Sequence, residues 1–339
     1  HFNRSATADM PELDISKAAR AFKKLPEGIV LPPSKISLKM KIAPERLSLK
    51  KISFRLKRSA VSLKGSVLAG KDVSAKLYLN LKKLDIGEIA GIYAKSKKFH
   101  PRGLASGSLS VNYSKKLPSV AGSLRFEKIA AKGDGFSVAD LSGKAVVKRD
   151  SFFLKKIRGK LNGSPLSAEL QVLRFPRNPN ILFNIHLNKI TLPKMKPSAA
   201  VPSKKTAKQK RKFPPLSIRG KVKIDEVENS NFTGKAFYAS VNLHKITPEL
   251  SKISGSSSFS IKNGRVEDVY QIIRDYKPAK IVLYPVVILQ KASKKVKTLP
   301  NFNVINYSVI SGEYTFSRGN MTIKKSDLYS DMADVETRG

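Results

Sequence analysis

Apolar and polar residues alternate along much of the chain. In ISLKMKI (36–42) every second residue is apolar, and serine or lysine stands between them; SAKLYLNL (74–81) and GKVKIDEV (220–227) repeat the pattern. A period of two predicts β-strands with one apolar and one polar face. About 18 such runs can be counted, which predicts a mainly β fold: a long, curved antiparallel sheet with a few short helices.

Turn and helix signals are fewer. Asn263-Gly264 stands between two alternating runs, which predicts a hairpin turn at that dipeptide. Apolar residues at helical spacing predict short helices over 13–25, ending before Pro26, and over 267–276, ending before Pro278. We expect both helices to cap or plug the sheet.

A six-residue motif, apolar-x-apolar-x-[KE]-apolar, recurs along the chain. Its seven copies are LSLKKI (47–52), LNLKKL (79–84), LRFEKI (124–129), FFLKKI (152–157), IHLNKI (185–190), VKIDEV (222–227) and VNLHKI (241–246). Glycine followed by alternation recurs beside it, at Gly107, Gly122, Gly143, Gly220, Gly255 and Gly312. We expect these glycines at strand starts, where they tolerate a turn or bulge. A motif that recurs at such intervals predicts an array in which each unit covers the apolar face of its neighbour.

Four regions follow from these patterns. Residues 1–33 form a helix-containing lead-in, 34–195 a repeating β-sheet groove, and 217–339 a C-terminal β-sheet region. Between the last two, 196–216 is rich in lysine and proline and has no apolar period, as expected for an exposed linker or loop. The first residue, His1, and the final VETRG indicate a piece of a longer protein.

Composition adds a strong positive charge to this picture. The 339 residues include 65 Lys+Arg and 25 Asp+Glu, a net charge of +40. Residues 1–216 hold 46 basic and 13 acidic residues (net +33), and 217–339 hold 19 and 12 (net +7). Such a field attracts polyanions and anionic membrane surfaces, or it belongs to a solvated lysine face. Cysteine is absent, which excludes disulfides and thiolate chemistry.

Catalytic and metal-binding signals are weak, and we predict no enzyme and no cofactor. The four histidines are scattered, with His186 and His244 on polar strand positions where solvated side chains are expected, and no nucleophile elbow or phosphate-binding glycine loop occurs. An acidic cluster near the end lacks the spacing of a calcium loop: Asp327, Asp331, Asp334 and Glu336. The longest apolar stretch, IVLYPVVIL (281–289), is too short for a membrane-spanning helix.

Two segments resemble the AsmA-like proteins of bacterial envelopes, which are related to TamB and to bridge-like lipid-transfer proteins. Residues 140–195 are similar to their repeating strand unit. Residues 253–273, followed by 309–339, are similar to their C-terminal region of two glycine-containing hairpins around a short helix. The resemblance covers roughly 34–339 and is a pattern with few fixed residues; the strong basicity and the missing N-terminal anchor depart from the family.

The resemblance implies a groove lined with apolar side chains that carries phospholipid between the inner and outer membranes and supports outer-membrane homeostasis. It also implies a periplasmic location, with tethering to the inner membrane by a segment absent from this chain. Envelope partner proteins are implied without being identified, and an anionic membrane surface is a possible contact.

Alternation places a set of apolar residues on the groove side of the predicted strands. The expected lipid-binding residues are Leu77, Leu79, Leu81, Leu109, Val111, Leu124, Phe126, Ile185, Leu187, Val222, Ile224, Val241, Leu243, Phe259 and Ile261. The opposite face carries lysines that are expected to remain in solvent: Lys39, Lys41, Lys82, Lys144, Lys160, Lys221 and Lys223.

Three alternatives stay open. The apolar residues could instead face a closed protein core without a ligand, as in a structural scaffold or adhesin stalk. The lysine face could bind polyanions, either nucleic acid or lipopolysaccharide. Aromatic residues make up only 8% and tryptophan is absent, so no stacking platform for specific nucleic-acid binding is expected.

Overall fold

The computed structural model describes the following residues, of which 6–14 are described only in the course of their backbone: 6–14, 35–43, 45–69, 73–92, 99–114, 119–133, 135–175, 177–191, 214–248, 250–269, 271–272, 283, 286–288, 290–291 and 304–339. The chain divides into an N-terminal unit, His1–Gly163, and a C-terminal unit, Ser164–Gly339. The division falls between two strands, whereas the predicted linker 196–216 lies largely outside the described residues.

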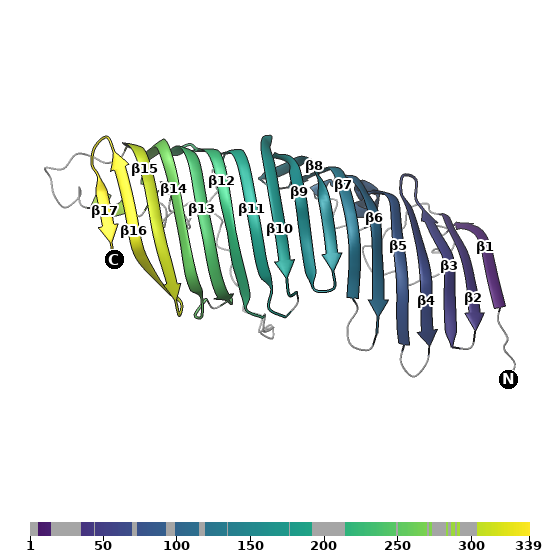
Figure 1. Cartoon of the computed structure of the whole chain (residues 1–339). Coiled ribbons are helices and arrows are strands. Elements are labelled where there is room, and N and C mark those ends of the chain that lie inside the picture. The colour runs from purple at the N-terminus through teal and green to yellow at the C-terminus, as the bar shows by residue number, and fades with distance from the viewer. Residues whose placement is uncertain are drawn as a thin grey trace, which may run out of the picture. The chain divides into compact units, whose positions relative to one another are not determined.

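The N-terminal unit is an antiparallel sheet whose strands pair in chain order (Figure 1). Its strands are β1 (Ala6–Asp14), β2 (Lys35–Ala43), β3 (Arg46–Arg55), β4 (Ala60–Ala69), β5 (Val73–Asp85), β6 (Arg102–Tyr113), β7 (Ser119–Gly133), β8 (Phe136–Lys148) and β9 (Ser151–Leu161). One short helix, α2 (Ile86–Ile92), connects β5 to β6. Its Glu88 accepts hydrogen bonds from the backbone N–H of Arg58 and the hydroxyl of Ser59, which ties the helix to the β3–β4 turn.

The C-terminal unit is also a sheet whose strands pair in chain order (Figure 1). Its strands are β10 (Ser164–Leu173), β11 (Asn180–Thr191), β12 (Leu216–Asn229), β13 (Phe232–Ile246), β14 (Ser254–Glu267), β15 (Val304–Ser317), β16 (Asn320–Ser330) and β17 (Val335–Arg338). Among the strands that the structure describes in this unit, β11 and β12 are the one pair that runs parallel. The segment between them is long enough for the crossover that parallel pairing needs. The mainly β, mostly antiparallel fold class is therefore confirmed.

The recurring sequence motif marks β-bulges. The apolar residues at the third and sixth positions of the motif are three residues apart. In a regular strand, residues three apart lie on opposite faces, so the extra residue of a β-bulge is needed to keep both side chains on one face. The pairing shifts register at this step between Leu49 and Ile52 on β3, Leu81 and Leu84 on β5, and Phe126 and Ile129 on β7. The motif's lysine has a left-handed φ in three copies: Lys128 (51°), Lys156 (53°) and Lys245 (54°). Each bulge increases the local strand twist.

Three local predictions differ from the structure. Leu13 and Asp14, the start of the predicted helix 13–25, end strand β1, and the other residues of that helix lie outside the described ones. Asn263-Gly264 makes no turn, since β14 runs through it, with Asn263 in a left-handed conformation (φ 45°). In the predicted helix 267–276, Glu267 ends β14, while Val269, Gln271 and Ile272 are helical.

Candidate functional site

The register aligns apolar side chains into one face of the N-terminal unit. Directly paired residues project to the same side of a sheet, so a row can be followed from strand to strand. One such row on β2–β6 is Leu38, Ile52, Leu63, Leu79 and Leu109. A neighbouring row on β2–β7 is Ile36, Phe54, Val61, Leu81, Gly107 and Leu124. The apolar sides of successive strands therefore coincide.

The predicted residues of this unit all lie on that face. Leu77 pairs with Val111, Leu79 with Leu109, and Phe126 lies beside Leu124 two positions along β7. Leu81 is 6% exposed, whereas the other predicted residues of this unit are half-buried. A face of half-buried aliphatic side chains keeps apolar surface available to a further apolar molecule.

The C-terminal unit has a second face of the same kind. Leu187 on β11 pairs with Leu166 and Ile224, and Ile185 pairs with Ala168 and Val222. The rows continue onto β13 and β14, where Ala239 pairs with Phe259 and Leu243 with Gly255. All eight residues predicted for this unit lie on this face: Ile185, Leu187, Val222, Ile224, Val241, Leu243, Phe259 and Ile261.

The two ends of this second face differ in how deeply their side chains are buried. On β11–β13 the residues Ile185, Val222, Val241 and Leu243 are half-buried, although Leu187 and Ile224 are 7% and 8% exposed. On β14–β16 the face is sealed, because Ile261 is 1% exposed and Ile310 and Leu328 are fully buried. Equally deep burial of Val269, Leu283 and Val286 shows that the residues after β14 contribute to a protein core.

One of the predicted lipid-binding residues, Ile261, therefore lines a closed core. Ile261, 1% exposed, offers no surface to a ligand, whereas Phe259, 8% exposed, is buried to the same degree as Leu187 and Ile224. Among the described residues, the β14–β16 end of this face is therefore a closed core, which is one of the arrangements that alternation alone left open. The covered face also provides an internal reference for how deeply these side chains are buried when a second layer packs on them.

Aromatic rings lie against glycines of the neighbouring strand on these faces. Phe183 pairs with Gly220, Phe126 with Gly143, Phe259 with Gly312 and Tyr307 with Gly264. A Cβ added at Gly220, Gly264 or Gly312 would collide with the facing ring, whereas one added at Gly143 would collide with the Ile157 side chain and lie 3.0 Å from the Phe126 ring. Of the six glycines expected at strand starts, Gly255 is near the start of β14. The other five lie inside their strands, so the prediction for them was wrong: Gly107, Gly122, Gly143, Gly220 and Gly312. The glycine leaves the space that the ring fills.

The opposite face is polar and positively charged. All seven lysines predicted to be solvated are exposed: Lys39, Lys41, Lys82, Lys144, Lys160, Lys221 and Lys223. Some of them are paired, as Lys160 with Asp140 at 3.8 Å and Lys223 with Asp225 at 3.2 Å. Exposed pairs of this kind contribute little to stability, so these lysines chiefly set the surface charge.

The two histidines on polar strand positions have partners that the sequence did not reveal. His186 Nε2 lies 2.9 Å from Asp225 Oδ2, because parallel pairing brings β11 beside β12. The hydrogen bond with His186, together with Lys223, holds the pKa of Asp225 below its ordinary value. His244 Nδ1 lies 3.3 Å from the Ser217 hydroxyl. Both histidines stay partly exposed, and we assign them to surface polar networks.

The acidic cluster near the C-terminus is neutralised by hydrogen bonds and cations. Asp327 is 1% exposed and forms ion pairs with Lys325 (3.0 Å) and Arg338. Burial alone would raise the pKa of Asp327, but the hydrogen bonds from Lys325 and Arg338 outweigh it and lower that pKa. Asp331 accepts a hydrogen bond from Asn306. Among the residues that the structure describes, no group of ligating side chains could hold a metal ion.

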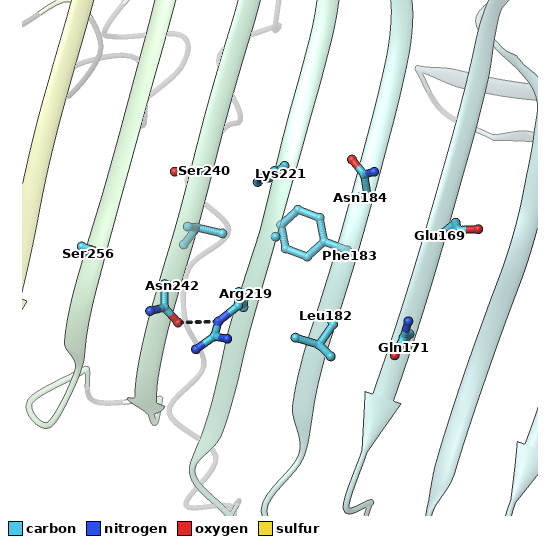
Figure 2. A pocket seen from close by; sticks show the side chains of 12 residues that line it. Glu169, Gln171, Leu182, Phe183, Asn184, Arg219, Lys221, Ser240, Asn242 and Ser256 are labelled. Atoms are coloured by element: carbon cyan, nitrogen blue, oxygen red, sulfur yellow. Dashed lines mark hydrogen bonds between the residues drawn. The ribbon is translucent and has the colours of Figure 1, made fainter.

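Two shallow troughs lie on the polar faces, one in each unit. Figure 2 shows the trough of the C-terminal unit, where Glu169, Asn184, Lys221 and Ser240 form one row across β10–β13. Beside this row, Arg219 Nε donates to Asn242 Oδ1 at 3.0 Å. The volume of this trough is about 460 Å³. The trough of the N-terminal unit is larger, about 850 Å³, and lies on β3–β7.

Comparison with protein families, curated proteins and solved structures gives no match for this chain. In the described part of the chain, no helix combines the length and the apolar character that crossing a membrane requires.

Proposed function

We propose that this chain is a non-enzymatic lipid-binding protein whose apolar sheet face shelters acyl chains. The proposal rests on one observation: the side chains of the apolar sheet faces are buried to different depths on different strands. In-register aliphatic rows on β2–β7 and β10–β13 are half-buried at most positions, with Leu81, Leu187 and Ile224 at 6–8% exposure, whereas Ile261, Ile310 and Leu328 on β14–β16 are at most 1% exposed. An extended apolar face left partly exposed in a highly charged protein indicates a site for an apolar partner.

The energetics favour acyl chains as that partner. A diacyl lipid has about 30 methylene groups, and each costs about 0.8 kcal/mol to expose to water, so sheltering them saves on the order of 20 kcal/mol. Neighbouring strands present similar aliphatic rows, such as Leu79 beside Leu109, and a bound chain would find near-equivalent positions along the face. Near-equivalent sites would let a lipid slide instead of being trapped.

The resemblance to AsmA-like proteins extends this proposal to phospholipid transport between the inner and outer membranes, in the periplasm of a bacterial envelope. The strand repeat and the open apolar faces support that assignment. The positive charge of the polar face would favour contact with anionic headgroups at a membrane surface. Polyanion binding through that polar face remains the second candidate, and it is supported by the exposed lysines.

One matched pair of substitutions tests the proposal on a single strand. Leu109 lies on the apolar face of β6 and Ser108, the preceding residue, lies on the polar face. We expect Leu109→Asp to lower the amount of co-purifying phospholipid at least fivefold, because a carboxylate interrupts the apolar row. Ser108→Asp adds the same charge and should leave bound lipid unchanged. Lipid extraction with native mass spectrometry measures both.

The folded state of each variant is checked by circular dichroism and thermal unfolding. Should Leu109→Asp unfold the unit, Leu109→Ser removes most of the apolar side chain at a smaller cost in stability and is compared with the same control. Wild-type protein without any acyl lipid, or an equal loss in the variants of both faces, would contradict the proposal.

A further inference from the structure

A ladder of small polar side chains crosses the polar face of the N-terminal unit. Six residues on β2–β7 pair one to the next in register: Ser37, Ser53, Ser62, Asn80, Ser108 and Ser123. At about 4.8 Å per strand, its five steps extend about 24 Å across the strands. Within the described part of the chain these side chains form no hydrogen bonds, and their hydroxyl and amide groups are free to bind a ligand.

Lysines line one side of this ladder. Lys50, Lys51 and Lys64 lie next to Tyr78 and Ser110 along the trough of about 850 Å³, and none of the residues that line this trough is acidic. Lys50 and Lys51 occupy the bulge of β3, where a bulge re-aims side chains. The structure shows no carboxylate partner for these three lysines among the residues it describes.

The lack of a carboxylate partner does not by itself distinguish these lysines, because Lys41, Lys82 and Lys144 also have none among the described residues. Lys160, Lys189 and Lys223 each have a carboxylate within ion-pair distance. The trough of the C-terminal unit includes Glu169 among its lining residues. Like charges on facing strands destabilise a sheet, and a cleft lined by one sign of charge concentrates anions. What distinguishes this trough is that three lysines line one cleft that has no acidic residue, and this clustering indicates an anionic ligand.

The side chains on the floor of the trough indicate which class of anionic ligand it can bind. Single-stranded nucleic acid is bound through a series of aromatic platforms, and this trough offers one ring, Tyr78, which is 51% exposed. Repeated hydroxyl and amide groups instead provide alternating donors and acceptors over an extended length. Such groups match the hydroxyls of a sugar chain, and Tyr78 offers one face on which a sugar ring can pack.

We propose that this trough binds an extended acidic glycan, with the sugar chain lying along the serine–asparagine ladder and its carboxylate or phosphate groups beside Lys50, Lys51 and Lys64. The site lies on the face opposite the apolar rows, since Leu63, Leu79 and Leu109 alternate with the ladder residues. It does not depend on lipid binding, and either proposal can fail without the other.

The test uses the full chain and a fluorescein-labelled decamer of galacturonic acid at 150 mM salt. We expect the triple variant Lys50→Gln, Lys51→Gln, Lys64→Gln to weaken binding at least tenfold in fluorescence anisotropy. A charge-matched control replaces three exposed lysines elsewhere on this unit, Lys132→Gln, Lys144→Gln and Lys148→Gln, and should weaken binding less than threefold. A neutral dextran decamer should not bind.

Two further measurements distinguish binding of the glycan from binding of other polyanions. The double variant Asn80→Ala, Ser108→Ala keeps every charge, and we expect it to weaken galacturonate binding about fivefold while leaving a thymidylate decamer unaffected. Equal losses in the two lysine triples, or thymidylate binding as tight as galacturonate, would show non-specific attraction of polyanions and overturn the proposal. A ladder variant that binds galacturonate like the wild type would also overturn it.

Discussion

Replacing Gly264 with alanine is expected to lower the free energy of unfolding by about 3 kcal/mol. Gly264 lies on β14 between β13 and β15, and a Cβ there would overlap the Thr233 carbonyl oxygen and the Tyr307 hydroxyl. Tyr307 is 3% exposed and donates a hydrogen bond to that carbonyl at 2.7 Å. The added methyl group must therefore displace a buried ring, separate two strands, or break this hydrogen bond.

Gly91→Ala is the control for this prediction. Gly91 lies in helix α2, and an added Cβ there would meet no atom within 4 Å. Alanine is favoured over glycine inside a helix, so this variant should be unchanged or more stable by up to about 1 kcal/mol. Chemical denaturation of both variants measures the difference. A Gly264→Ala protein as stable as the wild type would show that the ring does not pack against this glycine.

Asp327→Asn is expected to cost about 2 kcal/mol at pH 7, because it leaves two cations without their shared buried carboxylate. Asp327 is 1% exposed and joins Lys325 and Arg338 at the end of the sheet, where β16 pairs with the short edge strand β17. Both cations are partly exposed and can return to water, which limits the loss. The neutral amide keeps the shape of the side chain.

The pH dependence of this variant has a defined sign. The pKa of Asp327 is lowered in the folded state, so its contribution to stability is present above the ordinary pKa of aspartate, about 3.9, and disappears as the pH falls through the folded value. The stability difference between wild type and Asp327→Asn should therefore be full at pH 7 and shrink as the pH falls below about 4. Urea denaturation at several pH values measures it. A difference that grows as the pH falls below about 4 would exclude the ionised pair as its source.

Alternation along the chain was sufficient to predict the class of fold and the faces of its strands. Leu77, Leu79 and Leu81 lie on one side of β5 as their spacing requires, and their partners Val111 and Leu109 lie on the same side of β6. The recurring motif was recognised as a repeat, but its three-residue step carried a further signal. Two apolar residues three apart on one face require a bulge, as between Leu81 and Leu84.

Features that depend on tertiary contacts could not be derived from local patterns. Ile261 has the same alternation as Val241 and Leu243, and only residues distant in the sequence decide that Ile261 is sealed while the other two stay half-buried. Asn263-Gly264 has the local chemistry of a turn, but the glycine makes room for the Tyr307 ring and the strand continues.

The serine–asparagine ladder was hidden for a related reason. Ser62, Asn80 and Ser108 are unremarkable polar residues in the sequence, and they form a row only once the register of three strands is known. The register itself follows from bulges and turns that a count of apolar positions does not fix. The pairing of His186 with Asp225 depends in the same way on the parallel contact of β11 with β12.

Photolabelling with a phospholipid that carries a diazirine on its acyl chain tests the lipid-binding face most directly. After irradiation, mass spectrometry of the digested protein locates the adducts. We expect adducts on the apolar rows of β5 and β6, at Leu79, Leu109 and Val111. Few adducts are expected on Tyr78 or Ser110, which lie on the same strands but face the other side. Adducts spread equally over both faces, or confined to the polar one, would contradict the proposed lipid-binding face.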